Sequence, residues 1–497
     1  MSNLLPSIEL VILFTLFMPL VGAVFSVATK NKKLREICLL VVSGALFINM
    51  INLFSLGAKG ALPPVVITDI MPGLSLTFFI DPLGILFGLV ASFLWIVTTV
   101  YSVGYMDGNK EAHQPRFFAF FAISIFAAIG IAFAGNLLTL FLFYEILTLC
   151  TFPLVTHHGT LEAKKSGRTY LGILLGGSIV FFLPAMIWTY HLAGTLDFDV
   201  GGILNGKITP LSAGFLLLLF TFGVGKCAVM PLHRWLPAAM VAPTPVSALL
   251  HAVAVVKAGV FTFVKIIIYI FGAENLRGLI DQNWFAGGWL VYLAGTTILL
   301  ASIVALRQDN LKKMLAYSTI SQLSYVIMAA AILAPKSLIA AGFHIAAHAV
   351  GKITLFFAAG SIYTASHKKN ISQLDGIGKR MPYTMAAFTI GAISMIGLPP
   401  AVGFLSKYYM LVGAFENGQF FAISVIILST LLNAAYFLPI IFKAFFGVEK
   451  RPKNFKPHGE APTRIVIALS ITSALTLGLF LFPDIFLWLS LQPVVAR

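Results

Sequence analysis

Charged residues are scarce in this sequence. Only 10% of its 497 residues are Asp, Glu, Lys or Arg, and 59% are hydrophobic, whereas about a quarter of the residues of a soluble domain are charged. The longest polar stretch, residues 447–464, is too short to fold by itself. The composition therefore excludes a soluble globular protein and a separate soluble domain.

Cysteine is also rare. The chain has three cysteines, Cys38, Cys150 and Cys227, which lie within apolar runs and lack the spacing of metal ligands. This pattern argues against a disulfide framework, a zinc site and an iron–sulfur site. Nothing indicates a nucleotide, haem or flavin site either. We therefore expect no metal and no cofactor, and we expect any redox coupling to belong to partner subunits.

Long apolar runs, in contrast, recur from end to end. About fourteen of them are long enough to span a bilayer, and they lack the alternation of a membrane β-barrel. We expect an all-α polytopic membrane protein of about fourteen transmembrane helices. The expected spans are residues 7–28, 35–57, 74–103, 116–134, 136–156, 169–190, 210–230, 243–270, 284–305, 316–333, 337–363, 384–413, 420–446 and 463–490.

The net charge of +15 is distributed unevenly. Basic residues gather in every second connection, for example at Lys32 and Lys33, at Lys164 and Lys165, and at Lys312. By the positive-inside rule this side is cytoplasmic, which places both termini outside. The alternation argues against nucleic-acid binding and predicts a multi-pass protein of a bacterial-type inner membrane.

Several ionisable residues lie inside the apolar runs. Each costs about 2.5–3.5 kcal/mol at mid-membrane, so such residues usually face the bundle interior and mark an ion route. Lys265 and Lys443 lie near span ends, and we expect them to reach the headgroups. Glu145 needs a cationic partner to stay ionised, in a proton switch or in a static pair that joins two helices. The residues in or near spans are Glu145, Lys226, Lys257, Lys265, Lys352, Lys407 and Lys443.

Two spans contain helix-breaking residues next to a lysine. "CAVMPLHRWLP" follows Lys226 and contains Pro231; "MIGLPPAVGFLSKYYM" contains Pro399 and ends near Lys407. Irregular backbone at membrane depth is tolerated where it lines a polar cavity. One broken helix in each half of the chain is the pattern of an inverted-repeat transporter.

A column of titratable residues lies between and beyond these breaks. In "GFHIAAHAVGKITLFF", His344, His348 and Lys352 are spaced by four and share one helix face. His251 and Lys257 occur in "HAVAVVKAG". The column is either a pair of histidines that bridges helices or a proton relay, and the other buried ionisable residues favour the relay.

These motifs resemble one family. "GKCAVMPLHRWLPAAMVAPTPVSALLHAVAVVKAGVF", "FHIAAHAVGKITLFFAAG" and "IGLPPAVGFLSK" are similar to the antiporter-like proton-pumping subunits of respiratory complex I and of Mrp antiporters. The resemblance covers about residues 75–445. One complex I subunit carries glutamate where Lys407 stands. Lysines at both Lys257 and Lys407, with this chain length, look most like the MrpD subunit type of the multisubunit Mrp sodium/proton antiporter.

The resemblance implies a fold and a set of functional residues. The fold is fourteen helices with two inverted five-helix repeats: residues 1–115 form N-terminal helices, 116–270 and 284–446 the repeats, and 463–497 a last helix. The implied proton carriers are Glu145 paired with Lys226, then Lys257, His344, His348, Lys352 and Lys407. The implied gating or hydration residues are His233, His251, Pro231 and Pro399.

The function implied is proton movement along this relay, coupled to sodium moving the other way. The implied partners are the large MrpA subunit and the small hydrophobic subunits of an Mrp complex. A proton-pumping subunit of a complex I or membrane-bound hydrogenase is the alternative. Two further classes fit less well. A membrane iron enzyme would use "HIAAH" and "THHG" at His157 and His158; a solute permease leaves the lysine series unexplained. Asp81 is expected to be mainly a helix cap.

Overall fold

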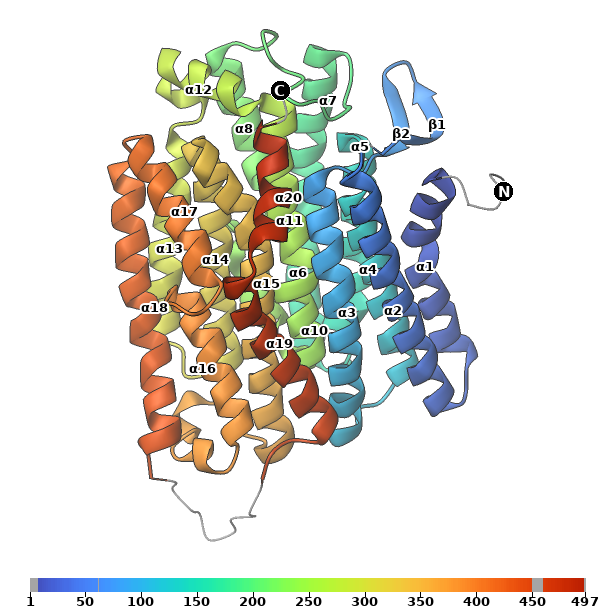
Figure 1. Ribbon diagram of the computed structural model, residues 1–497, viewed down its shortest axis with the longest axis vertical. Helices are drawn as coiled ribbons and strands as arrows, with labels where there is room; N and C mark the ends of the chain where they lie inside the picture. Colours follow the sequence, from blue (N-terminus) through green and yellow to red (C-terminus); the bar gives the residue numbers. More distant parts are fainter. Residues whose placement is uncertain (1–7, 61, 449–458, 496–497) are drawn as a thin grey trace.

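The computed structural model describes residues 8–60, 62–448 and 459–495. Long helices run side by side along one axis, and a short β-hairpin stands at one end of the bundle (Figure 1). Eleven helices in the described part are long and apolar enough to cross a membrane, or up to twelve when one bent pair counts as a single span. The all-α polytopic fold is confirmed, and the count of fourteen spans stays a prediction.

The N-terminal region is two helices, a hairpin and a third helix: α1 (Ile8–Ala28), α2 (Lys32–Gly57), β1 (Val65–Met71), β2 (Leu74–Phe78) and α3 (Pro82–Gly108). The expected helical start at residue 74 was wrong. Residues 74–78 alternate as "LSLTF" and pair antiparallel with β1. The helix begins only after Asp81, whose Oδ1 accepts a hydrogen bond from the Gly84 amide at 2.8 Å, so the expected cap is confirmed.

Four regular helices precede the first break: α4 (Gln114–Ala132), α5 (Leu137–Val155), α6 (Leu161–Gly177) and, after the π-helical turn η1 (Ser178–Phe182), α7 (Leu183–Ala193). The chain then enters α8 (Pro210–Gly223), which ends well short of a full span. Short helices follow: η2 (Gly225–Cys227), η3 (Leu232–Arg234), α9 (Trp235–Ala238) and η4 (Ala239–Val241). Pro231 and Pro237 lack the amide hydrogen that a continuous helix needs, so this interruption agrees with the sequence.

A further interruption was not expected. The predicted continuous span 243–270 consists of α10 (Thr244–Ala248), the π-helical turn η5 (Leu249–Val253), α11 (Val255–Lys265) and a second π-helical turn, η6 (Ile266–Phe271). π-Helical turns widen the backbone and are frequent at functional sites. Lys257 therefore lies one turn beyond a local distortion. Two short elements, α12 (Ala273–Gln282) and η7 (Trp284–Ala286), lead to the second half.

The second half contains α13 (Trp289–Leu306), α14 (Leu311–Ile332), α15 (Pro335–Ser366), η8 (Ile371–Gln373), η9 (Ile377–Lys379), α16 (Pro382–Ile396), α17 (Gly403–Glu416) and α18 (Phe420–Phe446). The chain ends with α19 (Thr463–Leu481) and α20 (Asp484–Val495), so the expected last span is divided at Pro483. The break between α16 and α17 lies where "GLPPAV" predicts it. In Figure 1, α1 begins and α20 ends toward the same end of the bundle.

Helix α15 lies at the centre of the molecule. It packs against α3, α14, α16, α17 and α19, and its most apolar window is completely buried. A polar side chain on α15 therefore faces other helices whichever way it points. The histidine column on this helix must be satisfied by protein groups or by enclosed water.

Gly259 allows the two irregular segments of the first half to touch. A Cβ atom at this position would lie 2.6 Å from the backbone carbon of Lys226 and 2.7 Å from the amide nitrogen of Cys227. Atoms cannot approach this closely, so α11 contacts η2 only because residue 259 has no side chain. The glycine thereby sets the position of Lys226 relative to Lys257.

We predict that Gly259→Ala destabilises the protein, because the added methyl group pushes α11 away from η2. Overpacking of this kind costs about 1–3 kcal/mol. Gly278→Ala is the control, since a Cβ there meets no atom within 4 Å. Melting of the detergent-solubilised protein, followed by size-exclusion chromatography after heating, measures the effect. Equal melting temperatures for the two variants would contradict the prediction.

Candidate functional site

Lys257 and His348 connect the two halves of the chain. The Lys257 ammonium on α11 donates a hydrogen bond to Nδ1 of His348 on α15, and both side chains are buried. The ring of His344, one turn away, stacks beside that of His348 with centroids 5.9 Å apart and planes 19° apart. Lys257 and His348 are 91 residues apart in sequence, so this junction exists only in the folded protein.

The line of polar groups continues from His344 to Lys407. His344 Nδ1 lies 2.8 Å from the hydroxyl of Ser406, the residue before Lys407 on α17. The ring of Tyr325 lies beside both groups, 6.0 Å from the His344 ring and 4.9 Å from Lys407 Nζ. The structure thus brings Lys257, both histidines and Lys407 into one buried series.

The second broken helix holds Lys407 in place. Its ammonium donates to the carbonyl oxygens of Met395 at 2.9 Å and Ile396 at 2.8 Å, the last two residues of α16. These carbonyls lack the partners that a continued helix would supply, and the negative end of the helix dipole stabilises a cation. Gly397 follows at φ +90, and a Cβ there would lie 2.6 Å from the Lys407 side chain. The break is therefore a binding site for the lysine.

Lys352 lies on a side branch. Its ammonium donates to the hydroxyl of Ser318 on α14 at 2.8 Å, and Tyr436 of α18 donates to the same oxygen at 3.0 Å. The spacing of four predicts that Lys352 shares a helix face with the two histidines. In the structure, however, His344 contacts Ser406 on α17, whereas the hydrogen bond of Lys352 goes to α14.

Lys226 occupies the first break. Its ammonium donates to the carbonyl of Tyr144 at 2.8 Å and the hydroxyl of Thr148 at 2.6 Å, and it lies 3.0 Å from the centroid of the Tyr144 ring. The backbone amide of Lys226 donates to the Tyr144 hydroxyl at 3.0 Å. These contacts hold the lysine against α5 without a carboxylate.

Glu145 lies between the residues that hold Lys226, but the two charged groups are separate. Both carboxylate oxygens of Glu145 are buried and have no hydrogen-bond partner among the described residues. The hydrogen bonds of Lys226 go to Tyr144 and Thr148 instead. The structure therefore does not join Glu145 to Lys226, and their pairing stays a prediction.

The expectation for Lys265 was wrong. Its side chain is buried at the end of α11 and does not reach the bundle surface. It lies 3.4 Å from Oδ1 of Asp81 and donates to the carbonyl of Ala134 at 3.1 Å. Lys443, in contrast, is exposed near the end of α18, as expected. Hydropathy placed both lysines near span ends. Whether each side chain is buried or exposed depends on the helices packed around it.

The predicted gating residues lie apart from this series. His233 is half-buried in η3, with its ring 6.2 Å from that of Tyr317. Pro231 precedes η3 and Pro399 lies between α16 and α17, and both are exposed. His251 lies in η5, and its side chain is outside the described residues. A gating role for these four residues stays a prediction.

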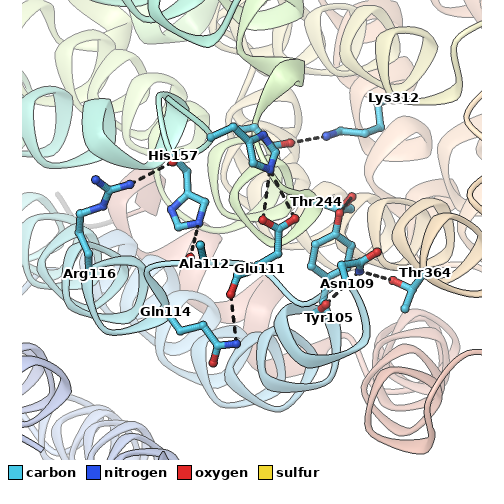
Figure 2. A network of polar contacts seen from close by, with 12 residues as sticks. Tyr105, Asn109, Glu111, Ala112, Gln114, Arg116, His157, Thr244, Lys312 and Thr364 are labelled. Carbon is cyan, nitrogen blue, oxygen red and sulfur yellow. Dashed lines mark hydrogen bonds and ion pairs between the residues drawn. The ribbon is translucent and has the colours of Figure 1, made fainter. Parts of the chain in front are cut away.

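Sequence reasoning missed a polar network at the other end of the bundle from the hairpin (Figure 2). His158, after α5, lies 3.3 Å from a carboxylate oxygen of Glu111, after α3. Lys312 of α14 donates to the carbonyl of Ala242 at 2.6 Å, two residues before α10. The network joins elements of both halves, and the "THHG" motif beside the basic connection was the available signal.

His157 and Glu111 in this network have shifted pKa values. Burial lowers the pKa of His157 to about 4. The Nε2 atom of His157 lies 3.0 Å from the carbonyl oxygen of Ala112, and the guanidinium of Arg116 donates a hydrogen bond to the backbone carbonyl of His157 at 3.0 Å. Burial by itself would raise the pKa of Glu111, but the hydrogen bond and charge of His158 lower it overall. His157 is thus kept neutral while Glu111 is kept ionised.

We predict that acid destabilises this end of the protein through His157. In the unfolded chain a histidine titrates near pH 6.5, and in the folded chain the pKa is about 4. The unfolded state therefore binds the proton first, and the contribution of neutral His157 is lost as the pH falls from 6.5 to 4. Melting temperatures of His157→Gln should depend less on pH over this window than those of the wild type.

His191→Gln is the matched control, since His191 is exposed in α7. This variant should keep the wild-type pH dependence. An unchanged slope in His157→Gln would show that other groups cause the acid sensitivity.

Comparison with known proteins gives matches along most of the chain. The family model described as "NADH:quinone oxidoreductase/Mrp antiporter, TM" matches residues 134–433. A second model, described as "NADH-Ubiquinone oxidoreductase (complex I), chain 5 N-terminus", matches residues 72–118. The first match includes every residue of the buried series from Glu145 to Lys407.

Some of the curated relatives are named as NADH-quinone oxidoreductase subunits and others as antiporter subunits. NADH-quinone oxidoreductase subunit N of Desulforudis audaxviator is 34% identical over 75% of this chain and 74% of its own length. The A-type subunit of a Na(+)/H(+) antiporter from Alkalihalophilus pseudofirmus is 32% identical over 92% of this chain. The A/B-type subunit of a probable K(+)/H(+) antiporter from Rhizobium meliloti is 33% identical over 82% of it. The chain spans 59% and 41% of these two antiporter subunits.

Two solved structures share the fold. A chain of the Mrp complex from Dietzia sp. DQ12-45-1b superposes with a TM-score of 0.85 at 21% identity, over 99% of this chain and 97% of that one. A chain of the membrane-bound sulfane sulfur reductase, an archaeal respiratory membrane complex, gives 0.84 at 24% identity, over 97% of each chain. The backbone arrangement is therefore common to an antiporter and a respiratory complex.

Proposed function

Because the chain belongs to the NADH:quinone oxidoreductase/Mrp antiporter transmembrane family, we propose that it is the proton-translocating subunit, of the MrpD type, of a multisubunit Mrp-type cation/proton antiporter. It is a multi-pass membrane protein, and we place it in a bacterial-type inner membrane with both termini outside. The observation that carries the proposal is the buried series from Lys257 through His348 and His344 to Lys407, which crosses between the two halves of the chain.

The first step is a switch at Glu145 and Lys226. When the carboxylate pairs with the ammonium, it stabilises the proton on Lys226. In the structure Glu145 is separate and Lys226 is held by neutral groups of Tyr144 and Thr148. Such groups stabilise a cation less than a carboxylate does. This arrangement is the one from which Lys226 releases its proton toward Lys257.

The second step is transfer along α15. Lys257 donates to Nδ1 of His348, so His348 can take that proton and release another from Nε2. His344 stacks beside it and contacts Ser406, and the neighbouring Lys407 accepts the proton after it has released its own. Water enclosed between these groups would complete the contacts that side chains do not make.

Electrostatic coupling is strong enough to drive the steps in order. Two unit charges about 7 Å apart interact with roughly 2–3 kcal/mol at an effective dielectric constant of 20. This corresponds to about two pKa units per neighbour. A change at Glu145 therefore alters the protonation of the next group without a large movement of helices.

The two interrupted helices support an inverted-repeat organisation. We assign residues 116–270 and 284–446 to the repeats, with residues 1–115 and 463–497 around them. Each repeat then contributes one broken helix and one lysine at the break, Lys226 in the first and Lys407 in the second. In an Mrp-type complex the proton flux is coupled to sodium moving in the opposite direction.

A second assembly is favoured by other relatives. Subunits N and L of NADH-quinone oxidoreductase match the same part of the chain, and the sulfane sulfur reductase shares the fold. In such a complex the same relay would carry the protons that are pumped, and the driving redox reaction would take place in other subunits. The transport role is the same in both, and the chain itself is a transporter subunit without enzyme activity.

We predict that Glu145→Gln abolishes proton transport and leaves assembly intact, because it removes the charge that switches Lys226. Sodium-driven proton movement in everted vesicles should fall at least tenfold, and partner subunits should co-purify in wild-type amounts. Glu162→Gln, at an exposed glutamate of α6, is the control and should be fully active. Loss of assembly in Glu145→Gln would favour a static pair.

We also predict which proteins surround the chain. Extraction from native membranes in mild detergent, followed by mass spectrometry, should recover one large antiporter-like subunit and several small hydrophobic subunits in fixed ratio. Recovery of NADH-dehydrogenase or hydrogenase subunits would assign the relay to a redox complex. An active chain that purifies alone would contradict the multisubunit proposal.

A further inference from the structure

Lys265 and Asp81 form a second buried charged site, displaced from the central series. Lys265 is eight residues beyond Lys257 on α11, which is about 12 Å along a helix axis. It lies at the end of α11, next to the residue that caps the start of α3. Both side chains are almost inaccessible, with 1% and 5% of their surfaces exposed.

Oxygen acceptors and aromatic rings surround the Lys265 ammonium. Oδ1 of Asp81 lies at 3.4 Å, the carbonyl oxygen of Ala134 at 3.1 Å, and the centroid of the Phe198 ring at 4.5 Å. The ring of Tyr269, one turn further along, is 5.6 Å away. The lysine is therefore enclosed by α3, the connection before α5 and the loop before α8.

Helix capping does not require the lysine. Asp81 Oδ1 already accepts the Gly84 amide at 2.8 Å, and asparagine caps a helix about as well as aspartate. A buried ion pair seldom stabilises a protein more than apolar residues of the same volume, because each ion loses its hydration. A lysine and an aspartate at this depth therefore point to a role that uses their charge.

Two further polar groups belong to this region, one in the ion pair and one between Lys257 and Lys265 on α11. Oδ2 of Asp81 and the hydroxyl of Thr262 are buried and have no hydrogen-bond partner among the described residues. Thr262 precedes Lys265 by three positions, so the two side chains are neighbours on the helix surface. A water molecule needs such polar partners to occupy a buried position. The helix segment between Lys257 and Lys265 thus contains a hydroxyl, that of Thr262, that can bind a water molecule.

Polar groups continue from Lys265 to the surface. Asp197, the residue before Phe198, is exposed and accepts hydrogen bonds from Asn136 Nδ2 at 3.2 Å and Thr195 Oγ1 at 3.1 Å. Asn136 follows Ala134 by two residues, and its Nδ2 also donates to the Ser75 carbonyl of β2 at 2.7 Å. The buried ammonium thus contacts Phe198, which directly follows the exposed Asp197 in the chain.

We propose that Lys265 and Asp81 form a proton-exchange branch of the relay at Lys257, through which protons pass between Lys257 and the face of the membrane where α3 begins. The proposal rests on the proposed function, since it needs a proton on Lys257. The Lys265 ammonium first transfers its proton to the Asp81 carboxylate, and the neutral amine then accepts the proton from Lys257. Asp81 releases its proton past Phe198 toward Asp197. The positive-inside rule makes this the outer face.

The variant Lys265→Arg distinguishes a role in proton exchange from a role as a static ion pair. A guanidinium keeps its charge and can still pair with Asp81, but it does not release its proton in a protein. In everted vesicles that contain the whole complex, Lys265→Arg should assemble at wild-type level and lose at least tenfold in the initial rate of sodium-driven proton movement. Lys443→Arg, at the exposed lysine of α18, is the matched control and should be fully active.

A neutral pair provides the second test. The double variant Asp81→Asn/Lys265→Met keeps the helix cap and removes both charges together. The complex should therefore assemble, but it should not carry out sodium-driven proton movement. A wild-type rate in either Lys265→Arg or the double variant would overturn the proposal. Loss of assembly in both would assign the pair to structure alone and would also overturn it.

Glu145→Gln in the same vesicles separates this proposal from the proposed function. If Glu145→Gln is inactive while Lys265→Arg is fully active, the relay is correct and its exit lies elsewhere. If Glu145→Gln is itself fully active, the relay is wrong.

Discussion

The loss of hydration of a charged group inside an apolar bundle is the constraint on which the rest of this structure depends. An ammonium or carboxylate at mid-membrane costs several kcal/mol unless protein groups replace the water that it leaves. The buried lysines meet this requirement in different ways. Lys226 uses a carbonyl, a hydroxyl and an aromatic ring, Lys257 a histidine, Lys352 a serine, and Lys407 two helix-terminal carbonyls.

The irregular backbone follows from the same requirement. A regular helix satisfies its own carbonyls and offers few of them to a side chain. Interrupting α16 exposes the carbonyls that hold Lys407, and the absence of a side chain at Gly259 lets α11 approach the segment that carries Lys226. Prolines and glycines that would weaken an isolated span here create polar positions within the membrane, where the surrounding helices exclude lipid from the exposed backbone.

Neutral partners also keep the series responsive. A lysine held by a carboxylate in a tight pair stays charged, whereas a lysine held by carbonyl, hydroxyl or imidazole groups gains less from its charge. Glu145 is separated from Lys226, the lysine that it is expected to control. Asp81 and Lys265 are paired instead, and they lie next to the start of α3 and the end of α11.

Composition and spacing by themselves determined the membrane class, the positions of the two expected broken helices and the ionisable residues that lie within the apolar runs. These features depend on local properties: the length of apolar runs, the missing amide hydrogen of proline and the cost of charge in lipid. The strands before α3 and the π-helical turn at Leu249–Val253 were not predictable in this way, because apolar runs that pair as strands or widen as π-turns have the same hydropathy as helices.

Only the tertiary structure decided which ionisable groups meet. Lys257 and His348 are 91 residues apart, and Asp81 and Lys265 belong to helices at opposite ends of the first half of the chain. Lys265 and Lys443 look equivalent in sequence, since each is a lysine near the end of an apolar run; one is enclosed and the other exposed. The physical reason is that hydropathy measures depth along a helix, whereas contact depends on the direction of the side chain around the helix and on the elements packed there.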